Sequence, residues 1–237
     1  MRVRATLVVV ALHAAIAACS GTETGNPGTA RVAFGLRASD PALVSVGTDG
    51  SGNRVEALLL AVDQAALIGC DARSGATPLF EEPVVVDLVR GTDAVIPAGE
   101  YCGIRVTLAP RHLPAVVEAP AIEEATVAAH GVRADGVPFT IASRTPLSIV
   151  AEDGPFEVQD GDDLVLAFDV SVWLNGGVLE GAVVVDGRAT IDGTGNSAAQ
   201  FDQQVAAGLF RDRDGDGAIE PDETIPLAAV GPAGPRP

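Results

Sequence analysis

The feature that most constrains the fold is a series of short apolar or alternating runs between residues 31 and 187, separated by turn residues. None of these runs has a sustained 3.6-residue periodicity, so they predict strands rather than helices. The predicted strands cover residues 31–36, 55–68, 84–89, 94–96, 101–108, 126–132, 139–142, 147–151, 164–174 and 182–186. Runs at this spacing predict a mostly β protein, with an antiparallel β-sandwich over residues 31–190.

The pattern changes after residue 195. Phe201, Val205, Gly208 and Leu209 fall on one face of a helix, and the segment from residue 197 to 200 resembles a capping box. We therefore expect a C-terminal helix that runs to about Phe210 and docks on the sandwich. The remainder of the segment 191–237 is expected to hold one acidic loop and a Pro- and Gly-rich disordered tail.

The acidic loop spans residues 212–223 and has the spacing of a calcium site. Ca²⁺ binds hard oxygen ligands, which a 12-residue loop supplies from its first, third, fifth, seventh, ninth and twelfth places. Here these places hold Asp212, Asp214, Asp216, the carbonyl of Ala218, Glu220 and Glu223. Gly217 stands at the sharp turn and Ile219 is the apolar residue that follows it.

This loop closely resembles EF-hand and dockerin-type calcium loops, and the resemblance implies one bound Ca²⁺. Arg211 stands where EF-hands usually have an aromatic residue, and Pro226 leaves little room for a second helix. Because no second loop is visible for pairing, the expected role is structural rather than that of a switch. The alternative is an acidic Asp-Gly turn without an ion.

The N-terminus has the layout of a secretory signal. Arg2 and Arg4 precede an apolar run over residues 5–18, which is shorter than the roughly 20 residues needed to cross a bilayer. Residues 16–19 (Ile-Ala-Ala-Cys) resemble the lipobox of bacterial lipoproteins. The resemblance implies removal of residues 1–18, acylation of Cys19, a flexible tether over residues 19–30 and, because Ser20 follows, location in the outer membrane. An ordinary cleavage site is the alternative.

The cysteine count fits export. If Cys19 carries lipid, Cys70 and Cys102 remain as a pair, and an exported compartment allows them to form a disulfide. Two buried free thiols are the alternative. The segment 97–106 carries a Pro-Ala-Gly-x-Tyr pattern and resembles the edge of transthyretin-like and immunoglobulin-like sandwich domains of bacterial surface lipoproteins, a group that includes families with no assigned activity.

The charge excludes one class of partner. The chain has 32 acidic residues against 15 basic ones, all arginine, for a net charge of −17. Such a polyanion offers no basic surface to neutralise phosphates, so no nucleic-acid partner is expected.

Motifs for catalysis are absent from the sequence. It has no lysine, no nucleophile elbow, no zinc-protease motif and no phosphate loop. His112 and His130 are interpreted as surface or structural residues, and the acidic turn at 160–163 as a turn rather than a minor calcium site. Adjacent acids that are nominal glycosidase candidates are interpreted as a solvated face; they are Glu81, Glu82, Glu123 and Glu124.

The sequence therefore predicts an exported, lipid-anchored, non-catalytic binding or envelope protein with one structural calcium loop and an unidentified ligand. Two alternatives remain open. A calcium-dependent hydrolase of envelope or extracellular polysaccharide would gather carboxylates or His112 in a cleft. An adhesion module would present an exposed apolar patch, for instance around Trp173.

Overall fold

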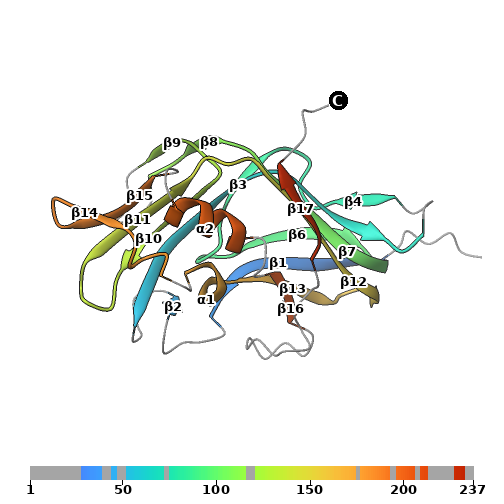
Figure 1. Ribbon diagram of the computed structural model, residues 1–237. Coiled ribbons are helices and arrows are strands. Elements are labelled where there is room, and N and C mark those ends of the chain that lie inside the picture. The colour runs from blue at the N-terminus through green and yellow to red at the C-terminus, as the bar shows by residue number, and fades with distance from the viewer. Residues whose placement is uncertain are drawn as a thin grey trace, which may run out of the picture.

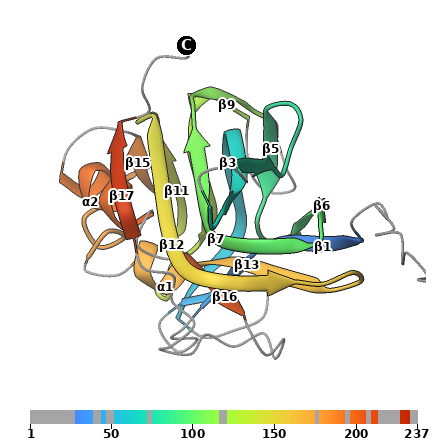
Figure 2. The ribbon, with the colours of Figure 1, turned by 90° about the vertical axis from the view of Figure 1, so that its right-hand side faces the viewer.

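The computed structural model describes residues 28–38, 44–46, 52–71, 75–115, 121–174, 177–192, 196–205, 209–212 and 227–232. The prediction of a mostly β, sandwich-like fold is confirmed. In Figure 1 the two short helices lie in front of the strands, and the turned view of Figure 2 shows them at one side of the molecule. No helix within these ranges is long and apolar enough to cross a membrane.

The smaller main sheet has four strands and is called sheet A here. Their order is β16 (Leu209–Asp212), β13 (Asp163–Asp169), β1 (Thr29–Arg37) and β6 (Thr92–Pro97). β1 is therefore central, parallel to β13 and antiparallel to β6. Its residues alternate, because Val32, Phe34 and Leu36 are buried while Arg31 is exposed and Arg37 is half-buried.

The larger sheet, sheet B, is built around β3, the longest strand. Its main path is β14 (Val183–Val185), β15 (Arg188–Asp192), β11 (Pro138–Ser143), β10 (Val127–Val132), β3 (Asn53–Gly69), β7 (Gly99–Leu108), β12 (Leu147–Val158) and β17 (Leu227–Pro232). β3 also pairs with β2 (Val44–Val46), β4 (Ala76–Pro78) and β5 (Val84–Asp87). A separate hairpin joins β8 (Arg111–Leu113) to β9 (Ile122–Ala125).

Most of the described strand pairs are antiparallel, as predicted, but the sheets are mixed. Three strand pairs in the described ranges are parallel, namely β1 with β13, β11 with β15, and β2 with β3. Parallel neighbours need long connections. Whether two strands pair in the parallel or the antiparallel direction therefore cannot be predicted from the residues of one strand alone.

The core lies between the two sheets. Val32, Phe34 and Leu36 of β1 pack in one cluster with Leu58 and Leu60 of β3. Figure 2 shows β12 bending sharply, and its pairing with β7 shifts register between Glu152 and Phe156. The bend carries the far half of β12 toward sheet A, where the turn at 159–162 joins it to β13.

The helices differ from the prediction at their ends. The strand expected over 164–174 ends at Asp169, whose carboxylate accepts a hydrogen bond from the Ser171 N–H at 2.9 Å and caps α1 (Val170–Trp173). The C-terminal helix is confirmed as α2 (Asn196–Val205), with Phe201 and Val205 buried. It ends before residue 210, and Leu209 instead belongs to β16.

The last segment is also more integrated than expected. Residues 227–232 fall in the tail predicted to be disordered, but they form β17 and pair with β12. β16 likewise joins sheet A. Two strands from the segment 191–237 are therefore edge strands of the two main sheets.

The turn before β7 has a defined hydrogen bond. Tyr101 is buried and its hydroxyl donates to the Pro97 carbonyl at 2.8 Å. A tyrosine that bonds back to the backbone a few residues upstream is a feature of immunoglobulin-like sandwiches. The hydrogen bond fixes the chain where β6 passes into β7.

Candidate functional site

The acidic segment before β13 forms a hydrogen-bonded turn. The Asp162 carboxylate accepts from the Gln159 N–H at 2.7 Å, and the Asp160 carboxylate accepts from the Thr29 N–H at 2.8 Å. Gly161 has φ +83°, a conformation that favours glycine. Two carboxylates of the cluster thus hold the backbone in place, which agrees with the interpretation as a turn.

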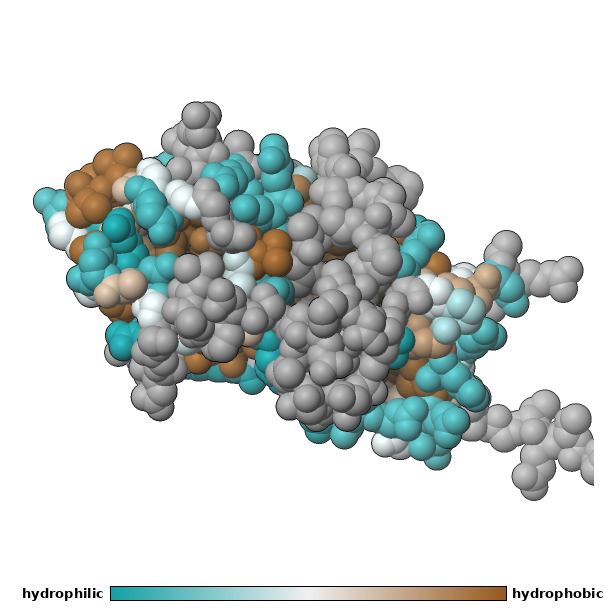
Figure 3. Space-filling model, turned by 60° about the horizontal axis from the view of Figure 1, so that its bottom comes forward, coloured by the Kyte–Doolittle hydropathy of each residue, from teal (hydrophilic) through white to brown (hydrophobic). Residues whose placement is uncertain are grey.

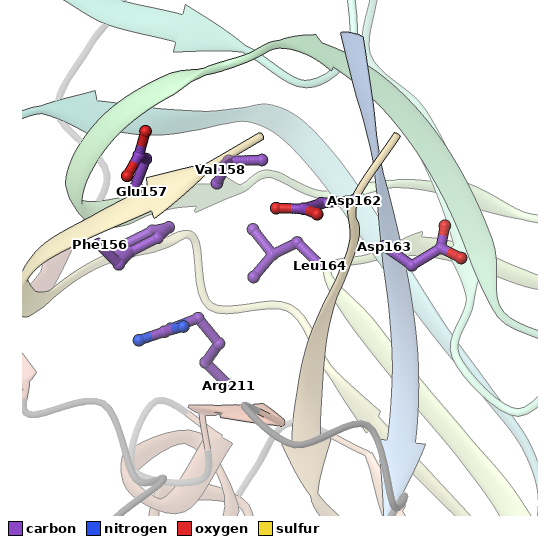
Figure 4. Close-up of a pocket in the computed structure, with 7 residues that line it drawn as sticks. All are labelled: Phe156, Glu157, Val158, Asp162, Asp163, Leu164 and Arg211. Atoms are coloured by element: carbon purple, nitrogen blue, oxygen red, sulfur yellow. The ribbon is translucent and has the colours of Figure 1, made fainter. Parts of the chain in front are cut away.

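A pocket of about 270 Å³ opens beside this turn. It lies between β12, β13 and β16, as Figure 4 shows. Asp162 and Leu164 point into it, whereas Asp163 points away toward β1. The Arg211 guanidinium lies 4.4 Å from the centre of the Phe156 ring, a cation–π contact.

The pocket walls are more acidic than basic. Glu157, Asp162 and Asp163 line it together with Arg211, and Asp163 also lies 3.3 Å from the Arg31 guanidinium. Within the described ranges, no three His, Cys, Asp or Glu side chains come close enough to hold a metal ion. The turn and pocket by themselves therefore supply no metal centre.

The pocket borders the start of the predicted calcium loop. β16 pairs with β13 so that Arg211 lies opposite Leu166 and Asp212 opposite Val165. The backbone of the first predicted ligand is thus fixed at the edge of sheet A. The other predicted ligands, Asp214, Asp216, Ala218, Glu220 and Glu223, lie outside the described residues.

The segment that leads into the loop is not the one expected from the resemblance to EF-hands. A strand, β16, takes the place of the incoming helix. Arg211 stands where EF-hands usually have an aromatic residue, and here it stacks on an aromatic residue of another strand. The contact between Arg211 and Phe156 was not predicted, because the two residues are far apart in the sequence.

The predicted disulfide is confirmed. Cys70 and Cys102 are bonded, with their Cα atoms 4.8 Å apart. Cys70 follows directly after β3 and Cys102 lies in β7, where Gly69 pairs with Tyr101. The bond therefore closes the end of the central strand pair of sheet B. Cys19 lies outside the described residues.

The two histidines occupy different environments. The His112 Nδ1 lies 2.8 Å from the Glu123 carboxylate on the β8–β9 hairpin, where both side chains are exposed. His130 is buried in β10, and its Nδ1 lies 3.2 Å from the Thr140 hydroxyl. Desolvation, together with the nearby Arg188 charge, lowers the pKa of His130 to about 4.

The sites considered for the alternative functions are not assembled where they were expected. Glu123 contacts His112 on the surface hairpin, and Glu81 and Glu82 are exposed before β5. Trp173 is fully buried between Phe168 and Phe201, so it cannot present an adhesive patch. The large apolar side chains that are exposed in the described ranges are Val95, Val183, Val184 and Val185.

Three of these exposed valines make up β14. This strand is the edge of sheet B and is bonded only to β15 among the described strands. Figure 3 shows apolar side chains gathered at the end of the molecule where β14 lies.

Comparison with known proteins finds one structure of low similarity and no similar sequence. No protein-family model matches the sequence, and no curated protein is significantly similar to it. Among solved structures, MbnP from Methylosinus trichosporium is similar, with 14% sequence identity over 85% of this chain and 99% of that chain, and a TM-score of 0.36. At this degree of similarity, neither fold nor function is carried over to the chain.

Proposed function

We propose that this chain is an exported lipoprotein of the bacterial outer membrane, anchored through Cys19, that binds a partner without catalysis. We further propose that residues 212–223 hold one structural Ca²⁺. The signal-like N-terminus supports export, and the disulfide suits an oxidising compartment.

The spacing of the acidic residues over 212–223 carries the calcium proposal, and the flanking strands indicate what role the ion would have. The strand before the loop, β16, pairs with β13 in sheet A, and the strand after it, β17, pairs with β12 in sheet B. The two ends of the segment 213–226 are thus attached to opposite layers of the sandwich. An ion bound by this segment would link the two sheets, which is a structural role.

The flanking strands also argue against a calcium switch. In sensor EF-hands, Ca²⁺ changes the angle between two helices, whereas here the residues before and after the loop belong to strands of a packed sandwich. We therefore infer an affinity in the extracellular range, on the order of 10⁻⁴–10⁻³ M.

Thermal unfolding of the full chain tests the calcium site. Because an ion that binds only the native state stabilises it by mass action, adding Ca²⁺ should raise the Tm relative to EDTA, and Mg²⁺ at the same concentration should raise it less. Asp214→Asn and Glu223→Gln should abolish the Ca²⁺ effect. Glu180→Gln removes an exposed acid outside the loop and should retain it.

Calorimetry supplies the decisive outcome. The wild type should give saturable heat with Ca²⁺, and the two loop variants should not. If the wild type shows no saturable heat up to ~10 mM, above the range known for extracellular modules, residues 212–223 form an acidic turn without an ion.

A further inference from the structure

A second cavity lies on sheet A, near the point where the pairing between β1 and β6 ends. β6 pairs with β1 only as far as the contact between Phe34 and Thr92. A groove of about 460 Å³ runs along the outward face of β1 past this point, where Gly35, Arg37 and the turn at 88–91 border it. The groove is separate from the acidic pocket at Arg211, and the two cavities share no lining residue.

The charge of this groove is opposite to that of the molecule. Arg31, Arg37 and Arg90 line it, and Asp93 is the one carboxylate among its lining residues. The lining residues alone thus carry a net charge of about +2 at neutral pH, in a chain whose net charge is −17, while Asp87 and Asp163 pair with Arg90 and Arg31 from outside the lining. We call the site formed by these four residues with Gly35 and Gly91 the arginine groove.

The three guanidinium groups retain capacity for a ligand. Arg37 has no acidic partner among the described residues and donates to the Leu36 carbonyl at 3.0 Å. Arg90 lies 3.4 Å from Asp87, and Arg31 lies between two carboxylates, 3.3 Å from Asp163 and 3.6 Å from Asp93. Each guanidinium has five N–H donors, so a single carboxylate contact does not use all of them, and the pairs of Arg31 join exposed side chains and contribute little.

Glycines leave the floor of the groove open. A Cβ at Gly35 would lie 3.4 Å from the Arg37 Nη1, and a Cβ at Gly91 would lie 3.3 Å from the Phe34 carbonyl. Gly91 also has φ +76°, which other residues rarely adopt. The bare backbone between Arg37 and Arg90 therefore gives a ligand access to both guanidinium groups.

We propose that the arginine groove binds a phosphate monoester. Such a group carries about −1.5 to −2 charges at pH 7, so it competes with the carboxylates paired to Arg31 and Arg90 more strongly than a single carboxylate would. Guanidinium groups form bidentate hydrogen bonds to phosphate oxygens. At physiological ionic strength, charges beyond roughly 8 Å are largely screened, so the acidic remainder of the surface does not prevent binding.

The groove also has space for the organic part of the ester. Val89 and Val165 line it beside the arginines, so an alkyl or glycerol portion would contact apolar atoms. The same phosphate chemistry occurs in a soluble ester and in a lipid headgroup. The proposal does not depend on the lipid anchor or on calcium.

Titration calorimetry of the full chain with sn-glycerol 3-phosphate tests the proposal. Arg37→Gln and Arg90→Gln should each weaken binding at least about tenfold, because each removes charge-assisted hydrogen bonds. Arg105→Gln, which removes an exposed arginine of β7, should leave binding unchanged. Raising the salt concentration should weaken the interaction.

Co-sedimentation with vesicles identifies the source of the phosphate. Retention on phosphatidic acid vesicles but not on phosphatidylcholine vesicles, lost in Arg37→Gln, would indicate a lipid headgroup. Binding of glycerol phosphate without vesicle retention would indicate a soluble ester. Three results would overturn the proposal: no saturable heat up to roughly 10 mM, tenfold above a millimolar Kd, with no vesicle retention; equal losses in all three variants; or equally tight binding of succinate.

Discussion

His130 is a residue whose environment could not be predicted from its neighbours in the sequence. Its ring is 3% exposed, and the Thr140 hydroxyl that it contacts also accepts a hydrogen bond from Arg188 at 3.3 Å. Burial and the positive charge both oppose protonation. The ring is therefore neutral in the folded protein at neutral pH.

We expect this histidine to make stability fall in mild acid. Its pKa is about 4 in the folded state and about 6.5 in an unfolded chain. The unfolded state therefore binds more protons between these values, and the free energy of unfolding decreases as pH falls from 6.5 toward 4. The expected loss is at most about 3 kcal/mol.

Urea denaturation at several pH values measures this effect. His130→Gln should show a smaller decrease in the free energy of unfolding between pH 6.5 and 4 than the wild type. His112→Gln, which removes an exposed histidine, should behave like the wild type. Identical pH dependence of the wild type and His130→Gln would contradict the prediction.

At the scale of the element, the disulfide stabilises the end of the β3–β7 pair. The two cysteines are 32 residues apart, and closing a loop of this size restricts the unfolded chain by roughly 3–4 kcal/mol in the chain-entropy description. We expect the double variant Cys70→Ser, Cys102→Ser to lose about that much free energy of unfolding.

Reductant provides the control for the disulfide. It should lower the urea midpoint of the wild type to that of the double variant and leave the double variant unchanged. A double variant as stable as the oxidised wild type would show that the bond does not stabilise the fold.

The sequence predicted the long strand β3, the C-terminal helix and several short strands, such as β5 and β14, but it missed other short strands. The run at 55–68 became β3, and Phe201 with Val205 correctly marked a helix. β16 and β17 were missed because a short edge strand is defined by its partner rather than by its own pattern. The chain changes from strand to helix after Asp169 because the carboxylate of this residue caps α1. The apolar residues on either side of Asp169 predict one continuous strand instead.

Of the two candidate sites, one could be predicted from the sequence and the other could not. The disulfide followed from counting cysteines, a property of the chain alone. The arginine groove did not, because Arg31, Arg37 and Arg90 come together only when the turn at 88–91 lies beside β1. A site made from segments far apart in the sequence can be predicted only when the order and pairing of the strands are known, and a local sequence pattern does not give these.

At the scale of the whole molecule, attachment to the membrane is expected to depend on one atom, the Cys19 sulfur. Full-length protein expressed in a Gram-negative host should fractionate with the outer membrane, and mass spectrometry should find its N-terminal peptide acylated. Cys19→Ser should be soluble or unprocessed and should lack fatty acid. A wild type without lipid, together with a membrane-bound Cys19→Ser, would contradict the lipidation.

The position of β1 at the centre of sheet A has a consequence for folding kinetics. Its first residue, Thr29, is bonded to Asp160, 131 residues later in the chain. The loop between them has to close before sheet A can form, and such non-local pairing is slow. β1 therefore stays unpaired on its β13 side until residues 163–169 are available, and both sheets reach their final strand order only once β16 and β17 have joined.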